Sequence, residues 1–319
     1  MRKWIRFIVI MLLLAGGAAV CAIRWQAWFS MPAEPHWQGD TIDYVFPYPT
    51  TQWSDSIAAN QKEFTMLVLG DIHNRFMQAD YDTLAARVPE VDAVAQAGDW
   101  MERGQEYYRQ VLLREWTNSA LSGLPVIACP GNHEYSKGIN KTISPVWERT
   151  FSYPHNGPVG VSGVSYYVDL PEVRFIIIDT NPLVHLVDLT RTLTWLRVAM
   201  NEADHRFIVV MMHHPVLSAG KGRYNPLIYV AFRHALNDAD LVIAGHDHSY
   251  MRREHFTVLN TAGKPKPQQM SFIPDVTDTV PAYGVLRISD LNAPTSNLRF
   301  NVYRMDDASL IDSLYVNHD

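Results

Sequence analysis

The stretch FTMLVLGDIH, residues 64–73, joins a short apolar run to a glycine, an aspartate and a histidine. An apolar run of this length, bounded by a turn residue, is typical of a buried strand in an α/β fold. Open α/β sheets bind their ligands beyond the carboxyl ends of the strands, which is where Asp71 and His73 would lie. The stretch therefore predicts an α/β fold with a candidate site at this strand end.

The same arrangement recurs along the chain, where short apolar runs of strand type alternate with longer segments of helical period. The expected strands are residues 64–69, 93–97, 125–129, 174–179, 207–212 and 240–244. The expected helices include residues 105–121, 190–203 and 226–237. The C-terminal runs GVLRISDL, NLRFNVYRM and SLIDSLYVN are expected to form antiparallel strands.

Composition limits the classes of function that remain open. The chain has 319 residues, of which 47% are hydrophobic and 19% charged, so it can bury a sizeable core. Its net charge of −6 gives no basic field of the kind that nucleic-acid backbones require, so no nucleic-acid partner is expected. With Cys21 and Cys129 as the sole cysteines, neither a disulfide framework nor a thiolate metal cage can be built. Any metal ligands must therefore be nitrogen and oxygen atoms.

The N-terminus carries a hydrophobic segment. Residues 7–23 are 17 consecutive residues without a charge, with three basic residues before them and Arg24 after them. At about 1.5 Å per residue the run reaches roughly 25 Å, against a bilayer hydrocarbon core of about 30 Å. Its length favours a retained transmembrane anchor over a cleaved secretory signal, whose apolar region usually has about 7–15 residues. Secretion after signal cleavage stays the alternative.

The positive charge before this run sets the expected topology, because it keeps the N-terminus in the cytoplasm and sends the following chain across the membrane. We expect a single-pass membrane protein with an extracytoplasmic catalytic domain. Residues 1–24 would form the anchor, residues 25–62 a tether that packs partly onto the domain, and residues 63–319 the domain itself.

Polar motifs follow five of the expected strands: GDIH (70–73), GDWMERG (98–104), GNHE (131–134), HHP (213–215) and GHDH (245–248). These motifs supply more carboxylate, amide and imidazole donors than one structural ion can bind. They suit two metal ions about 3.5–4 Å apart that share a carboxylate, for which Asp99 is the natural candidate. His246 and His248 share one face of an extended segment, so one can serve each ion.

In this order the five motifs resemble those of the binuclear metallophosphoesterases, also called calcineurin-like phosphoesterases, over roughly residues 64–253. The first three motifs are similar to those of serine/threonine protein phosphatases, GDxH, GDxxDRG and GNHE. The last two, HHPVLS and GHDH, resemble tartrate-resistant purple acid phosphatases. The resemblance implies a four-layer α/β/β/α fold and in-line attack on a phosphoester by a metal-bridging hydroxide, without a covalent intermediate.

The resemblance also implies a ligand set for each of two divalent metal ions, with Mn, Fe(II) or Zn as reasonable identities for nitrogen and oxygen donors. Purple acid phosphatases carry a tyrosine where this chain has Glu102, so a ferric–tyrosinate centre is not expected. The first ion would be held by Asp71, His73, Asp99 and His248, and the second by Asp99, Asn132, His213 and His246. His214 in place of His213 stays an alternative.

The resemblance also implies roles for residues that face the substrate. His133 would act as general acid for the leaving oxygen or as an orienting donor, and Asn132 would also contact the substrate. Glu102 would pair with His133 and Arg103 would bind the phosphate, with a solvated ion pair between the two as the alternative.

Substrate recognition is expected in the loops at residues 137–150, 152–164 and 218–225. The last holds Lys221, Arg223 and Tyr224, which either grip a phosphate or belong to a flexible polar loop.

Two acidic residues near the motifs are expected to lie outside the ligand sets. Asp247 should face away from the metal ions, either behind the ligands or toward solvent, because its neighbours face the opposite way. Asp179 ends an apolar run without a neighbouring donor in the sequence and is expected to be a turn residue.

These observations favour a phosphomonoesterase that acts on a phosphorylated small molecule or head group. The alternative within the same chemistry is a phosphodiesterase or pyrophosphatase acting on lipid or nucleotide head groups. A catalytically silent exported binding protein is the alternative of another class. A cytosolic protein phosphatase conflicts with the hydrophobic N-terminus and with the absence of an HGG motif.

Overall fold

The computed structural model describes residues 34–136, 142–161, 163–181, 186–204, 207–223, 225–293 and 295–317. The expected anchor at residues 1–24 lies outside this part of the chain. Across the described ranges, none of the helices combines the length and the apolar character that crossing a bilayer requires.

The first of two sheets has the strand order β13-β12-β11-β1-β2-β3. The parallel strands β1, β2 and β3 carry the first three motifs, and β11 to β13 extend the sheet in antiparallel fashion, as expected from the sequence. The bounds are β1 (Glu63–Leu69), β2 (Ala93–Gln96), β3 (Val126–Ala128), β11 (Ala282–Ser289), β12 (Asn297–Arg304) and β13 (Leu310–Val316).

The second sheet has the order β10-β8-β9-β7-β6-β5-β4, with β5, β6 and β7 parallel to one another. All six strands expected from the apolar runs are present, each to within one residue at either end. The bounds in this sheet are β4 (Tyr166–Leu170), β5 (Val173–Ile178), β6 (Phe207–Met212), β7 (Leu241–Ala244), β8 (Tyr250–Arg253), β9 (Phe256–Val258) and β10 (Val276–Asp278).

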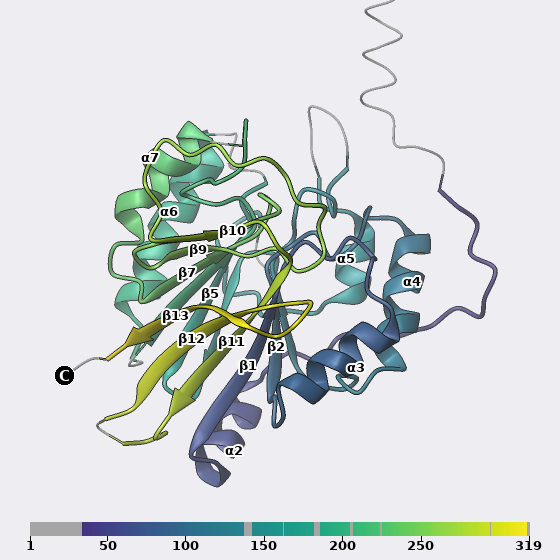
Figure 1. Cartoon of the computed structure of the whole chain (residues 1–319), viewed down its shortest axis with the longest axis horizontal. Coiled ribbons are helices and arrows are strands. Elements are labelled where there is room, and N and C mark those ends of the chain that lie inside the picture. Colours follow the sequence, from purple (N-terminus) through teal and green to yellow (C-terminus); the bar gives the residue numbers. More distant parts are fainter. Residues whose placement is uncertain are drawn as a thin grey trace, which may run out of the picture.

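Helices cover the outer side of each sheet (Figure 1). Alternate residues of β5 explain the layering: Phe175 and Ile177 belong to the large core shared by both sheets, whereas Ile176 and Ile178 pack with α6 and α7. The helices are α3 (Gln78–Arg87), α4 (Glu106–Thr117) and α5 (Pro145–Thr150) beside the first sheet, and α6 (Leu186–Asn201) and α7 (Pro226–Ala235) beside the second.

The segment before β1 contains a helix that its sequence did not predict. Helix α2 (Thr51–Asn60) begins after Thr50, whose hydroxyl accepts a hydrogen bond from the backbone N–H of Trp53. Ahead of it, the buried ring of Phe46 contacts Trp100 and Phe151. The tether expected at residues 25–62 therefore contains a helix at residues 51–60, and Phe46 packs onto the domain as expected.

Candidate metal centre

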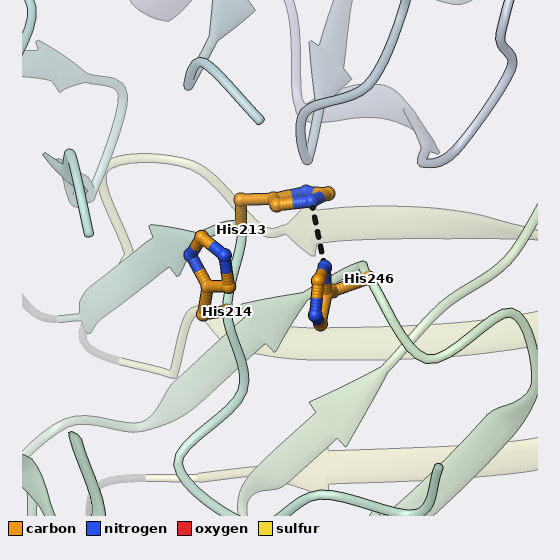
Figure 2. Close-up of side chains that lie close together, drawn as sticks. All are labelled: His213, His214 and His246. Atoms are coloured by element: carbon orange, nitrogen blue, oxygen red, sulfur yellow. Dashed lines mark hydrogen bonds between the residues drawn. The ribbon is translucent and has the colours of Figure 1, made fainter. Parts of the chain in front are cut away.

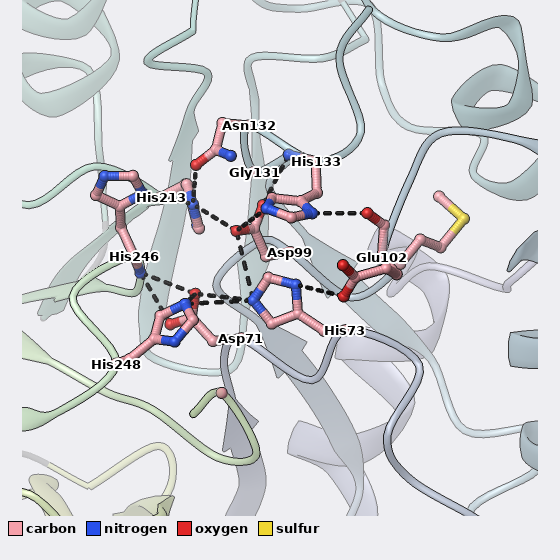
Figure 3. Close-up of polar contacts among 12 residues, drawn as sticks. Asp71, His73, Asp99, Glu102, Gly131, Asn132, His133, His213, His246 and His248 are labelled. Atoms are coloured by element: carbon pink, nitrogen blue, oxygen red, sulfur yellow. Dashed lines mark hydrogen bonds and ion pairs between the residues drawn. The ribbon is translucent and has the colours of Figure 1, made fainter. Parts of the chain in front are cut away.

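The loops that follow β1, β2, β3, β6 and β7 bring the predicted ligands together (Figure 3). One group comprises Asp71, His73 and His248, all buried. The Nε2 atoms of the two histidines are 3.3 Å apart, and Oδ1 of Asp71 lies 4.0 Å from Nε2 of His73 and 3.7 Å from Nε2 of His248. These atoms enclose a space in which one cation could contact all three side chains.

A second group surrounds Nε2 of His213. This atom lies 3.3 Å from Oδ2 of Asp99, 3.3 Å from Oδ1 of Asn132 and 3.2 Å from Nδ1 of His246. These are the four residues that the sequence assigned to the second ion.

Asp99 connects the two groups. Its Oδ2 atom lies 3.7 Å from Nε2 of His73 on one side and 3.3 Å from Nε2 of His213 on the other. Figure 3 shows the carboxylate between these rings. This is the position that a ligand shared by two ions would need.

Partners outside the centre fix the orientation of three imidazole rings. Nδ1 of His213 donates a hydrogen bond to the carbonyl oxygen of Ala97, and Nδ1 of His248 donates one to the carbonyl oxygen of Lys264. Both distances are 2.9 Å. Nδ1 of His73 faces Oε2 of Glu102 at 3.5 Å. Because Nδ1 of each ring faces outward, Nε2 points into the centre, which is the usual orientation of a histidine that binds a metal.

Five of the seven candidate ligands share a strained backbone conformation. Asp71, His73, Asp99, His246 and His248 have φ values of 52°, 52°, 53°, 75° and 55°. For residues other than glycine this left-handed region is sparsely populated, and such strain often accompanies functional sites. Backbone hydrogen bonds hold the conformation: the N–H of Asp71 donates to Gly98 O at 3.1 Å, and that of His73 to Asp99 O at 2.9 Å.

The loops also pack too closely for larger residues. Gly98 has a φ of 86°, and a Cβ atom there would lie 2.5 Å from Nδ1 of His213. A Cβ atom on Gly131 would clash with the carboxylate of Asp99. Both positions therefore require glycine if the centre is to keep this geometry.

Burial leaves most of the histidines neutral. It lowers the pKa of His73 to about 3 and that of His248 to about 4, and it lowers the pKa of His246 well below its usual range. Neutral imidazoles have the free lone pairs that metal ions require. The donors are all nitrogen and oxygen atoms, so the set fits divalent Mn, Fe or Zn.

The Asp99–His213 pair is an exception. Burial alone would raise the pKa of Asp99 and lower that of His213, but their mutual attraction outweighs burial. The pKa of Asp99 is well below its usual range, and that of His213 rises to about 9. In the metal-free protein this pair therefore behaves as an ion pair.

Glu134 supports the centre, although the sequence analysis gave it no role. Its buried carboxylate accepts backbone hydrogen bonds from Asp99 at 3.1 Å, Met101 at 2.9 Å and Gly131 at 2.7 Å. It thereby ties the loop after β2 to the loop after β3. The signal was present as the last letter of GNHE, but nothing in a single sequence says which backbone groups a glutamate will reach.

Glu102 lies elsewhere than predicted. Its carboxylate faces His73, whereas its backbone carbonyl oxygen accepts the hydrogen bond from Nδ1 of His133 at 2.6 Å. The expected side-chain pairing between Glu102 and His133 is therefore wrong. Within the described part of the chain Glu102 forms no ion pair with Arg103, whose side chain is half-buried.

His133 itself lies at the centre's edge. Its backbone N–H donates to Oδ1 of Asp99 at 2.9 Å, and its Nε2 is 4.0 Å from Oδ2 of the same carboxylate. The side chain is 33% exposed, so the ring is accessible to a substrate.

His213, rather than His214, is the histidine that contacts Asp99. Figure 2 shows the His213 ring turned to His246, with the His214 ring to one side. Nδ1 of His214 lies 2.7 Å from the hydroxyl oxygen of Thr180. Nitrogen atoms of all three histidines nevertheless lie within 4.8 Å of one another, so His214 borders the second group.

Of the three loop residues proposed for substrate binding, one lies at the centre, one is exposed and one is outside the described residues. Arg223 reaches the centre, with Nη1 2.8 Å from Nε2 of His246, whereas Lys221 is exposed. Tyr224 lies outside the described residues. Lys266, which the sequence analysis missed, places Nζ 3.3 Å from Nε2 of His248.

Two acidic residues near the motifs have defined structural roles. Asp247 is buried rather than solvent-facing, and it accepts hydrogen bonds from residues 218–220. Asp179 is more than a turn residue, because its carboxylate accepts hydrogen bonds from the hydroxyl of Tyr135 and the N–H of Asn181. The amide of Asn181 in turn donates to Gly131 O at 3.3 Å, which supports the loop after β3.

Comparison with proteins of known sequence agrees with this geometry. The chain is 28% identical over 142 residues to the glycerophosphodiester phosphodiesterase GpdQ of Enterobacter lignolyticus (strain SCF1). That match covers 43% of this chain and 46% of the relative, so the chain spans about half the length of this curated relative.

Solved structures share the fold at low sequence identity. The Plasmodium protein GAP50, described as the anchor in the inner membrane complex, aligns over 81% of this chain and 90% of its own, with a TM-score of 0.57 and 14% identity. The purple acid phosphatase PPD1 of yellow lupin (Lupinus luteus) aligns over 82% of this chain and 55% of its own, with a TM-score of 0.56 and 14% identity.

The family model for calcineurin-like phosphoesterases matches residues 64–250, which include every predicted ligand. The resemblance inferred from the five motifs is thereby confirmed. The chain belongs to the calcineurin-like phosphoesterase family.

Proposed function

We propose that this chain hydrolyses phosphoesters with the help of two divalent metal ions, and that its substrate is a phosphomonoester of a small molecule or head group. The observation that carries the proposal is the position of the Asp99 carboxylate between His73 and His213. When bound, a pair of ions would supply an acidified water molecule and neutralise the phosphoryl oxygens.

The chain's own residues would prepare the substrate. The amide of Asn132 and the ring of His133 border the centre, where they can orient a phosphoryl oxygen. Because Nδ1 of His133 donates to the carbonyl oxygen of Glu102, a protonated ring would present its Nε2–H to the leaving oxygen. His133 is therefore the proposed general acid.

A phosphodiester is the second candidate substrate. The identity to a glycerophosphodiester phosphodiesterase favours it, whereas the motifs HHPVLS and GHDH favour a monoester. Metal-depleted protein reloaded with Mn, Fe(II) or Zn should be assayed against p-nitrophenyl phosphate and its bis-ester. Faster turnover of the monoester supports the proposal, and faster turnover of the bis-ester supports the alternative.

A His133→Ala variant tests the catalytic assignment itself. Loss of the general acid should lower kcat by roughly 10²- to 10⁴-fold while the metal content stays that of the wild type. If wild-type and variant proteins are equally inactive on a broad phosphoester panel, the chain is a silent binding protein instead.

We also propose that residues 1–24 anchor the chain in a membrane with residues 63–319 on the extracytoplasmic side. The uncharged run at residues 7–23 and the basic residues before it support this topology. A reporter enzyme that works only outside the cytoplasm, fused after residue 62, should be active. Activity of a cytoplasmic reporter at the same position would overturn the topology.

A further inference from the structure

We propose that Arg223 and Lys266 form a cationic lip, which binds the terminal oxygens of a phosphate at the metal centre and selects dianionic monoesters over monoanionic diesters. The inference rests on the proposed function and adds the residues that determine its substrate class. The name cationic lip refers below to these two side chains alone.

The two cations stand over the two histidines of GHDH. Nη1 of Arg223 lies 2.8 Å from Nε2 of His246, and Nζ of Lys266 lies 3.3 Å from Nε2 of His248. Both cationic side chains are half-buried. One cation therefore borders each of the two ligand groups, although the two residues are far apart in sequence.

Backbone hydrogen bonds join the loops that carry the lip. The N–H of Lys221 donates to Pro267 O at 2.9 Å, and the N–H of Gln269 donates to Ala219 O at 2.9 Å. Residues 219–221 and 267–269 thus pair across one short ladder. The positions of Arg223 and Lys266 depend on each other through this contact.

Asp247 holds the lip to the metal centre. Its buried carboxylate accepts hydrogen bonds from the hydroxyl of Ser218 at 2.9 Å and from the N–H groups of Ala219 at 2.6 Å and Gly220 at 3.0 Å. Asp247 lies between His246 and His248 in sequence, so the turn that presents two ligands also fixes the loop of Arg223. This contact explains an acidic residue that faces away from the ions.

The two cations of the lip are not held in ion pairs among the residues that the structure describes. Within the described residues neither Arg223 nor Lys266 forms an ion pair with a carboxylate, and each faces a neutral imidazole. The carboxylates that attract Lys266 are Asp71, Asp99 and Asp247. Metal ions would neutralise the first two, and the third accepts hydrogen bonds from residues 218–220. Two half-buried cations beside neighbouring ligand groups are unfavourable unless an anion joins them.

Phosphate is the anion that suits this pair. A guanidinium and an ammonium group both form charge-assisted hydrogen bonds with phosphate oxygens. A monoester dianion has more charge and one more terminal oxygen than a diester monoanion. Loss of either cation should therefore weaken the binding of a monoester more than that of a diester.

The test uses the full metal-loaded protein and its Lys266→Met and Arg223→Met variants. Calorimetry measures the Kd of two probes independently of turnover. Inorganic phosphate forms a dianion, whereas dimethyl phosphate is a monoanion. Each variant should weaken phosphate binding about ten- to a hundredfold and dimethyl phosphate binding much less. The ratio of kcat/KM for p-nitrophenyl phosphate to that for the bis-ester should fall in parallel.

Two further variants serve as controls, and the metal content of every protein is measured first. Lys266→Arg keeps the charge and should retain phosphate affinity. Lys62→Met removes a charge from an exposed lysine before β1 and should change neither Kd. Equal weakening of both probes, or unchanged Kd in both methionine variants, would overturn the cationic lip.

Failure of the proposed function gives a different result. A metal-loaded wild-type protein that hydrolyses neither ester refutes the catalytic proposal. Calorimetry would still decide whether the lip binds phosphate.

Discussion

The carboxylate of Asp99 lies 3.3 Å from Nε2 of His213, whose Nδ1 donates to the carbonyl oxygen of Ala97, two residues before Asp99. One strand end therefore both orients the imidazole and supplies the carboxylate beside it. Because both side chains are buried, neither group can exchange this contact for one with bulk water.

Replacing Asp99 with asparagine should remove metal ions as well as activity. The amide keeps the size of the side chain but loses the charge that would join the two ligand groups. We expect a lower metal content and a fall in kcat/KM of about a thousandfold, on the order of 4 kcal/mol. Elemental analysis and steady-state kinetics measure both. Asp55→Asn, an exposed change on α2, is the control, and a fully loaded Asp99→Asn protein would contradict the assignment.

Metal binding by the metal-free protein should release protons. Burial alone would lower the pKa of His213, but Asp99 raises it to about 9, so the ring carries a proton at neutral pH. A metal ion that binds Nε2 must displace that proton. The proton competes with the metal ion for Nε2 below about pH 9, and above that pH the competition disappears. Apparent metal affinity should therefore increase as pH rises from 7 to 9. Calorimetry in two buffers with different ionisation enthalpies measures the protons, and a value of zero would contradict the prediction.

Glu102→Gln distinguishes the observed position of this side chain from the one expected by resemblance. Its carboxylate faces Nδ1 of His73, so its loss should weaken metal binding about 10- to 100-fold. At saturating metal concentration kcat should change little. Metal titrations followed by activity separate the two quantities. A lower kcat with unchanged metal affinity would instead restore a role beside His133.

The ligands could be predicted from the sequence because each follows its strand directly. Asp71 and Asp99 follow β1 and β2 of the first sheet and His213 follows β6 of the second, each within three residues of a strand end. Parallel order places such residues at the carboxyl ends of each sheet, and the packing of the two sheets brings these ends together. Local pattern was sufficient to identify the candidate donors, whereas their division between two ions came from the family resemblance.

Contacts between distant loops could not be predicted in this way. Lys266 lies next to His248 because residues 267–269 pair with residues 219–221. Neither loop has a periodic pattern that would predict this pairing. Short elements escaped for another reason: β9 and β10 each span three residues, too few to show an alternation. Helix α2 presents a short apolar face to the core, formed by Trp53 and Ile57, which is too little to predict a helix from the sequence.

Glu134→Gln should destabilise the fold and loosen the centre. The carboxylate accepts backbone hydrogen bonds from Asp99, Met101 and Gly131 through two oxygen atoms. A glutamine has one acceptor oxygen, and its NH₂ group would face an N–H donor, which leaves buried donors unsatisfied at about 1–3 kcal/mol each. Chemical denaturation of the metal-free variant should show this loss, and metal content should fall with it. Glu148→Gln, an exposed change on α5, is the matched control. Unfolding free energies equal to that of the wild type in both variants would mean that Glu134 does not hold the two loops together.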